Sequence, residues 1–94
     1  RKGSKVMAKF IFTAQAGGKR IREYREEKKW TINKMAAFAG MDAKHLKKLE
    51  DGLSEGTFLV YIHLMECMEK NISELFDQRF MDILYSLETG EMLS

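Results

Sequence analysis

The chain contains no proline and a single cysteine, and it has no long hydrophobic run. Because Cys67 has no second cysteine to pair with, an internal disulfide is excluded, and such sparing use of cysteine is typical of a reducing compartment. The longest apolar stretch, FLVYIHLM, is far shorter than the ~20 residues that a membrane-spanning helix needs. No signal-peptide pattern surrounds the short apolar patch KFIFT. We therefore expect a soluble, cytoplasmic protein with no membrane partner.

The sequence also lacks the residue groupings that catalysis requires. We find no carboxylate pair and no set of nucleophile, base and orienting residue. The segment AGGKR resembles part of a phosphate-binding loop, but it lacks the first glycine spacing and a preceding strand. His63 and Cys67 stand four residues apart, which suits metal chelation, yet they supply only two ligands. We expect no enzymatic activity, no metal and no cofactor, and we interpret Cys67 as a small core residue.

Charge is distributed unevenly along the 94 residues, which are enough for one domain with a single core. Residues 1–29 contain ten basic and three acidic side chains, a net charge of +7. Residues 30–52 have a net charge of +1, and residues 53–94 have a net charge of −6. This asymmetry favours a molecule with one face suited to a polyanion, although a scatter of solvated charges is the simpler interpretation.

Local signals predict an all-α protein of five helices. Residues 1–17 read as a basic arm, in which KFIFT has strand composition but no partner strand in the chain. We expect loose order there, with pairing to a second copy as the alternative. Helical patterning begins after Gly17 and Gly18. Further helices are predicted at residues 32–39 and 43–51, after Thr57, and after Ser73 or Asp77. Thr31 and Asp42 are the predicted N-caps of the first two of these helices. Glycines 40, 52 and 90 are expected at C-terminal ends.

Apolar residues recur at helical spacing in each of the last four helices, which predicts their buried faces. The expected core positions are Ile32, Met35, Ala36 and Ala39, then Leu46 and Leu49, then Phe58, Tyr61, Ile62, Met65 and Met68, and finally Phe80, Ile83, Leu84 and Leu87.

The second and third predicted helices form a helix-turn-helix. Ala36 is small where the next helix crosses, Gly40 can make the turn, and Leu46 and Leu49 face inward. The residues left on the outer face of the third helix are Ala43, Lys44, His45, Lys47 and Lys48. A helix fits the DNA major groove, where lysine can contact phosphates or guanine acceptors, so the pattern predicts a recognition helix.

Residues 18–76 resemble the Cro/repressor-like (XRE-type) family of bacterial and phage transcription regulators. The segments that carry the resemblance are GKRIREYREEKKWTINKMAAFAGMDAKHLKKLEDG and NISELF. The resemblance implies a lambda-repressor-like fold and a pair between Arg25 and Glu50. It also implies base reading by Ala43, Lys44 and Lys48, and it places Thr31 and other residues of the second helix near phosphates. We expect phosphate contacts from Arg22, Thr31, Asn33, Lys34, His45 and Lys47. The chain departs from the family at Ile32, where glutamine is frequent.

The C-terminal helix, in residues 77–94, is predicted to join two copies. Its apolar residues Phe80, Ile83, Leu84 and Leu87 exceed what a four-helix body needs, so we expect a two-fold dimer on a near-palindromic operator, with packing inside the chain as the alternative. The DNA-binding interpretation has three versions: a phage or mobile-element repressor, a restriction-modification controller, or an antitoxin-type autorepressor. A protein-binding module that reuses the fold is the alternative without DNA.

Overall fold

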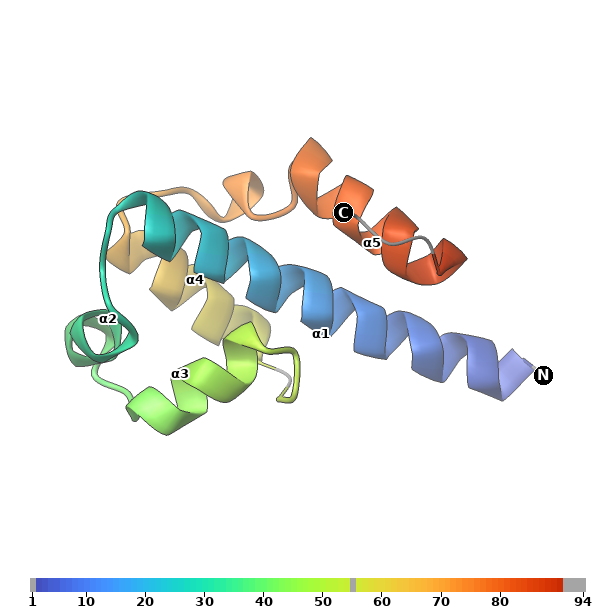
Figure 1. The fold of residues 1–94 in the computed structure, drawn as a ribbon, viewed down its shortest axis with the longest axis horizontal. Coiled ribbons are helices and arrows are strands. Elements are labelled where there is room, and N and C mark those ends of the chain that lie inside the picture. Colours follow the sequence, from blue (N-terminus) through green and yellow to red (C-terminus); the bar gives the residue numbers. More distant parts are fainter. Residues whose placement is uncertain (1, 55, 91–94) are drawn as a thin grey trace.

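The structure is a computed structural model that describes residues 2–54 and 56–90, with side chains at residues 13–54 and 56–90 (Figure 1). The elements are α1 (Lys2–Glu27), α2 (Ile32–Ala39), α3 (Ala43–Glu50), α4 (Phe58–Cys67), a short 3-10 helix η1 (Ile72–Glu74) and α5 (Gln78–Thr89). No strand occurs in these described ranges. The prediction of an all-α chain with five helices is confirmed. None of the described helices combines the length and hydropathy that a membrane crossing would require.

Helix α1 runs along most of the long axis of the molecule (Figure 1). Its 26 residues correspond to about 39 Å at 1.5 Å per residue, and the longest dimension of the structure is 41 Å. Both α3 and α5 pack directly on α1, whereas α2 packs on α3 and α4. The expected loose arm at residues 1–17 is therefore wrong for residues 2–17, which are helical; Arg1 lies outside the described residues.

The glycine pair that we interpreted as the start of the first helix lies inside α1, and Gly18 is the point where α3 crosses. A Cβ atom added to Gly18 would lie 2.9 Å from the carbonyl oxygen of Glu50 and closer still to that of Leu49. Real Cβ atoms essentially never approach backbone oxygen so closely. The glycine therefore lets the backbones of α1 and α3 come together; it does not interrupt α1.

The predicted starts of the last four helices agree with the structure because their caps are local. The Thr31 side chain accepts a hydrogen bond from the Lys34 backbone, and Asp42 accepts one from the Lys44 backbone. Gly40 has φ of 68°, the left-handed conformation that the turn between α2 and α3 needs. Of the two predicted caps for the last helix, Asp77 is the one that caps α5.

One core joins α1, α2, α3, α4 and η1. Its fully buried side chains are Ile21, Met35, Leu46, Leu49, Leu64, Met65, Met68 and Leu75. The predicted inner face of α4 was shifted, because Phe58 is 57% exposed and Leu64, which we did not predict, is completely buried. The stretch FLVYIHLM is apolar on nearly every side, so its periodicity gives only a weak indication of which face turns inward.

A second, smaller core lies between α5 and α1, and it corrects the predicted dimer interface. Phe80 and Ile83 are buried with Ala16 of α1, and Leu84 and Leu87 pack partly against the same cluster. Phe80 and Ile83 are therefore not available for the interface that we expected, and Leu84 and Leu87 are only partly exposed. Packing inside the chain satisfies them because α1 extends far enough to cover α5, as Figure 1 shows. Dimerisation itself stays a prediction.

Candidate nucleic-acid interface

The candidate interface is built on α2, the turn at Gly40–Asp42 and α3. Each of the two helices has eight residues, and each begins at a capping side chain. Met35 and Ala36 of α2 are buried against the core, as are Leu46 and Leu49 of α3. The inward faces of both helices are thus fixed, and this determines which side chains of α3 face outward.

A buried ion pair fixes the C-terminal end of α3 to α1. The Nε atom of Arg25 donates to Oε2 of Glu50 at 2.7 Å, and the Nη2 atom of Arg25 donates to Oε1 of Glu50 at 2.9 Å. Arg25 also donates to the backbone oxygen of Trp30 at 2.7 Å, so one side chain joins α1, α3 and the segment before α2. The hydrogen bond to Glu50 raises the pKa of the Arg25 guanidinium. The two residues expected to pair are therefore brought together in the structure.

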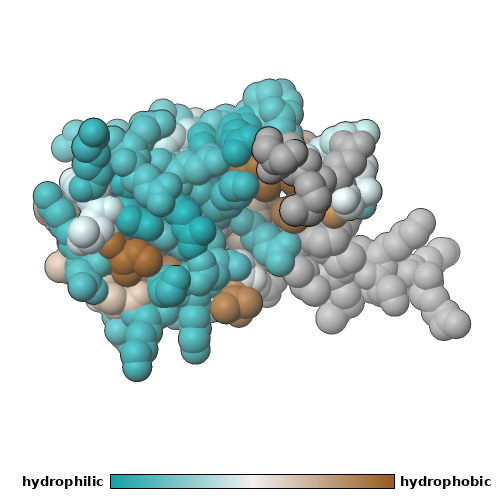
Figure 2. Space-filling model, in the orientation of Figure 1, coloured by the Kyte–Doolittle hydropathy of each residue, from teal (hydrophilic) through white to brown (hydrophobic). Residues whose placement is uncertain are grey.

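The outer face of α3 carries most of the residues predicted to meet DNA. Lys44, His45, Lys47 and Lys48 are exposed, and Ala43 is half-buried because it packs partly against the core. Figure 2 shows hydrophilic side chains projecting along the edge of the molecule that α3 forms. The Nζ atom of Lys47 lies 3.4 Å from a carboxylate oxygen of Asp51, so the two residues form an exposed ion pair at the C-terminal end of α3. Lys44 and Lys48 are one helical turn apart on this face.

Among the other predicted phosphate contacts, the residues of α2 are accessible and Arg22 is already engaged. Thr31, Asn33 and Lys34 are exposed around the start of α2. Arg22, in contrast, pairs with Asp51 and approaches a Glu50 oxygen at 3.4 Å. Although desolvation acts in the opposite direction, the hydrogen bonds from Arg22 and Lys47 lower the pKa of Asp51. Arg22 therefore braces the end of α3 in the free protein, and its phosphate contact stays a prediction.

The sequence did not predict the aromatic pair that Trp30, just before α2, forms with Phe38 of α2. The Trp30 ring stacks on Phe38 with a centroid distance of 5.0 Å, and Phe38 is 60% exposed. The ammonium groups of Lys28 and Lys34 lie 5.3 Å and 5.6 Å from the centroid of the Trp30 ring. These are cation–π distances, so the indole holds two lysines near the start of α2. The spacing of Trp30 and Phe38, eight residues apart across a helix boundary, gives no sequence signal.

The His63–Cys67 pair lies near the C-terminal end of α2. The Nε2 atom of His63 lies 2.8 Å from the Ala39 carbonyl oxygen, and 3.9 Å from the Cys67 sulfur. Desolvation, with a contribution from Glu66, raises the pKa of the Cys67 thiol, which disfavours the reactive thiolate. Within residues 2–54 and 56–90, no three His, Cys, Asp or Glu side chains gather in a metal-binding arrangement.

Folding brings the basic and acidic halves of the sequence together, so the predicted charge separation is reduced in space. Arg20 of α1 pairs with Asp77 at 2.6 Å, and Glu23 of α1 pairs with Arg79 at 2.8 Å. Tyr24 donates to the Glu74 backbone oxygen at 2.8 Å. These contacts join α1 to the start of α5 and neutralise some of the charges that were counted in separate segments. The lysines of α3 do not take part in this network.

The chain matches no protein-family model, no curated protein and no solved structure.

Proposed function

We propose that the protein is a sequence-specific DNA-binding transcription regulator, a repressor by class, that places α3 in the major groove. The observation that carries the proposal is the contrast between the two faces of α3. Leu46, Leu49 and Glu50 fix the inner face to the rest of the protein. Lys44 and Lys48 extend from the outer face. A rigid helix with an exposed basic face is the geometry that major-groove recognition uses.

The proposed contacts divide into base reading and backbone binding. Lys44 and Lys48 would donate to the O6 and N7 acceptors of guanine, with Ala43 close to the base edges. Lys47, His45 and the exposed residues Thr31, Asn33 and Lys34 would contact phosphates. Of the three regulator types, we favour a phage or mobile-element repressor over a restriction-modification controller and an antitoxin-type autorepressor.

Two copies on a near-palindromic operator would give the proposed regulator its specificity. A two-fold dimer would set its two α3 helices about 34–36 Å apart, one turn of DNA. The buried face of α5 cannot supply the contact, but the opposite face of that helix exposes Met81 and Tyr85. Light scattering of the free protein and of its DNA complex tests this part of the proposal. A single copy in both samples would contradict it.

Fluorescence anisotropy with labelled duplex DNA tests the DNA-binding proposal as a whole. We expect affinity to fall steeply with salt, since each neutralised phosphate adds about 0.9 to the log–log slope. The double variant Lys44→Ala/Lys48→Ala should bind at least tenfold more weakly. The matched control is Lys70→Ala, which removes the same type of charge from a lysine that lies over the Tyr24 ring, away from α3. Equal binding by wild type and the double variant, or an equal loss in the control, would overturn the proposal.

A protein-binding module is the second candidate, because large apolar side chains are exposed next to α3. Leu53, Phe58 and Leu59 lie within one short stretch and are 77%, 57% and 75% exposed. Clusters of this type often mark protein interfaces. Retention on heparin at low salt separates the two candidates. A DNA-binding protein is retained and released by salt, whereas a protein-binding module passes through.

A further inference from the structure

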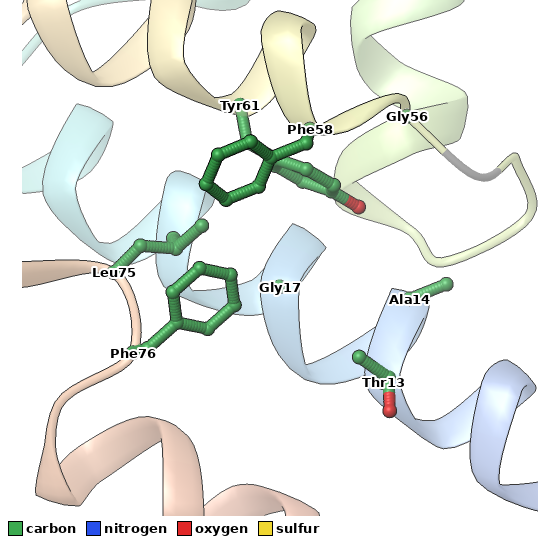
Figure 3. A pocket seen from close by; sticks show the side chains of 8 residues that line it. All are labelled: Thr13, Ala14, Gly17, Gly56, Phe58, Tyr61, Leu75 and Phe76. Carbon is green, nitrogen blue, oxygen red and sulfur yellow. The ribbon is translucent and has the colours of Figure 1, made fainter. Parts of the chain in front are cut away.

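An apolar pocket of about 180 Å³ lies where α1, α4 and the segment before α5 meet. Figure 3 shows that Gly17 and Ala14 of α1 form one side, and that Phe58 and Tyr61 of α4 form another. Leu75 and Phe76 complete it from the segment that follows η1. Three of these residues are aromatic, and Leu75 is fully buried.

Packing contacts hold part of the pocket wall in place, although Phe58 and Phe76 are 57% and 43% exposed. Gly17 contributes only backbone, and a Cβ atom placed there would touch the Tyr61 ring at 3.4 Å. The Phe76 ring packs edge-on against Phe80, with a centroid distance of 5.1 Å and an angle of 84°. The same ring is nearly parallel to that of Phe58, at 6.4 Å and 11°. Phe80 belongs to the buried cluster between α5 and α1, so the wall at Phe76 is anchored to the fold.

The chemistry of the walls defines the ligand. None of the described residues that line the pocket is charged, so none of them would compensate the desolvation of a charged ligand. Apolar cavities of roughly 150 Å³ accept benzene, so the volume suits one ring system. Aromatic walls favour an aromatic guest through stacked and edge-to-face contacts. We propose that this pocket is a binding site for a neutral, ring-sized aromatic molecule.

The site is separate from the proposed DNA contacts. None of its lining residues belongs to the outer face of α3 or to the exposed start of α2. The proposal therefore does not rest on DNA binding, and it is tested without DNA.

The experiment is a titration of the ¹⁵N-labelled protein with indole, followed by amide chemical shifts. Benzenesulfonate, which carries the charge that the pocket should reject, serves as the control ligand. We expect saturable indole binding with Kd of about 1 mM or tighter. The largest shifts should fall on the backbone amides of Gly17, Gly56, Leu75 and Phe76. Benzenesulfonate should leave these amides unchanged.

Two variants test the pocket in opposite ways, one by filling its volume and the other by removing one of its walls. Ala14→Leu fills it and Phe76→Ala removes a wall, and each should weaken indole binding at least tenfold. The matched controls are Ala37→Leu and Tyr85→Ala, which make similar changes at exposed positions outside the pocket and should bind indole as wild type does.

Several results would overturn the proposal. These are the absence of saturable shifts, shifts that map elsewhere, and wild-type affinity in a folded Phe76→Ala variant. Shifts of the pocket amides that follow protein concentration without ligand would also overturn it, since the occupant would then be a second copy.

Discussion

Replacing Gly18 by alanine should destabilise the protein, although alanine is the better helix former. In the interior of α1, the exchange of glycine for alanine alone favours folding by about 0.5–1 kcal/mol. At Gly18 the new methyl group would lie 2.9 Å from the Glu50 carbonyl oxygen and closer still to that of Leu49. Both obstacles are backbone atoms, so no rotamer change relieves the clash. Overpacking of this kind costs roughly 1–3 kcal/mol, and we expect the upper end.

The net effect is then a loss of about 2 kcal/mol, or a fall in Tm of about 10 °C for a domain of this size. The neighbouring variant Gly17→Ala is the control, because its methyl group would make only an ordinary 3.4 Å contact with the Tyr61 ring. That variant should have an unchanged or slightly higher Tm. Thermal and urea unfolding followed by circular dichroism measure both. If the two variants shift Tm equally, or if Gly18→Ala is the more stable protein, the proposed close crossing of α1 and α3 is wrong.

Three further predictions concern the ion pairs and the smaller core. Glu50→Ala strands a buried guanidinium and should cost ~3–5 kcal/mol in urea unfolding; a wild-type midpoint would show that the pair does not stabilise the fold. The pKa of Asp77 is lowered in the folded state. Desolvation acts to raise this pKa, but hydrogen bonds from the Phe80 backbone and Arg20 lower it by more. The stabilisation from Asp77 is therefore present above its unfolded pKa of about 4 and lost as pH falls through the lower folded value. Asp77→Asn keeps an N-cap acceptor and should flatten the acid side of a Tm-versus-pH curve; an unchanged acid side would contradict the assignment. Phe80→Ala should cost ~3–5 kcal/mol, and a loss below about 1 kcal/mol would show that α5 is not packed on α1.

The boundaries of α2 and α3 could be predicted from sequence because local interactions set them. Thr31 and Asp42 accept hydrogen bonds from residues two or three positions ahead, and Gly40 takes its left-handed φ within its own turn. The inward faces of these two helices follow from the spacing of apolar residues in short segments. Most of the exposed face of α3 follows from the same pattern, with Ala43, half-buried, as the exception.

The errors about the N-terminal arm and the dimer interface share one cause, which is the length of α1. Gly17 and Gly18 resemble a helix break in sequence, and only the crossing of α3 explains why glycine is needed within a continuous helix. With α1 assumed to be short, α5 had no surface to pack on, and its apolar face was assigned to a second copy. The Ala16 side chain that covers Phe80 belongs to the very segment that we had interpreted as an arm. Contacts between residues this far apart leave no trace in a single sequence.

The predicted charge separation is reduced in space for a related reason. Arg20 and Asp77 are 57 positions apart in sequence and yet hydrogen-bonded at 2.6 Å. Counting charges along the chain treats such residues as members of opposite halves. The lysines of α3 are exposed, as predicted. Among the described residues, no acidic side chain from a distant segment pairs with Lys44 or Lys48.

In vitro selection from a random duplex DNA library tests the central proposal, that α3 reads base sequence, most directly. The wild-type protein should enrich a defined motif, with guanines at the positions that Lys44 and Lys48 reach. The Lys44→Ala protein, verified to be folded, should enrich the same motif with relaxed preference at one position, which corresponds to a loss of about 1–3 kcal/mol of discrimination. Failure of the wild-type protein to enrich any motif, or identical motifs from wild type, Lys44→Ala and Lys48→Ala, would contradict the assignment of α3 as a recognition helix.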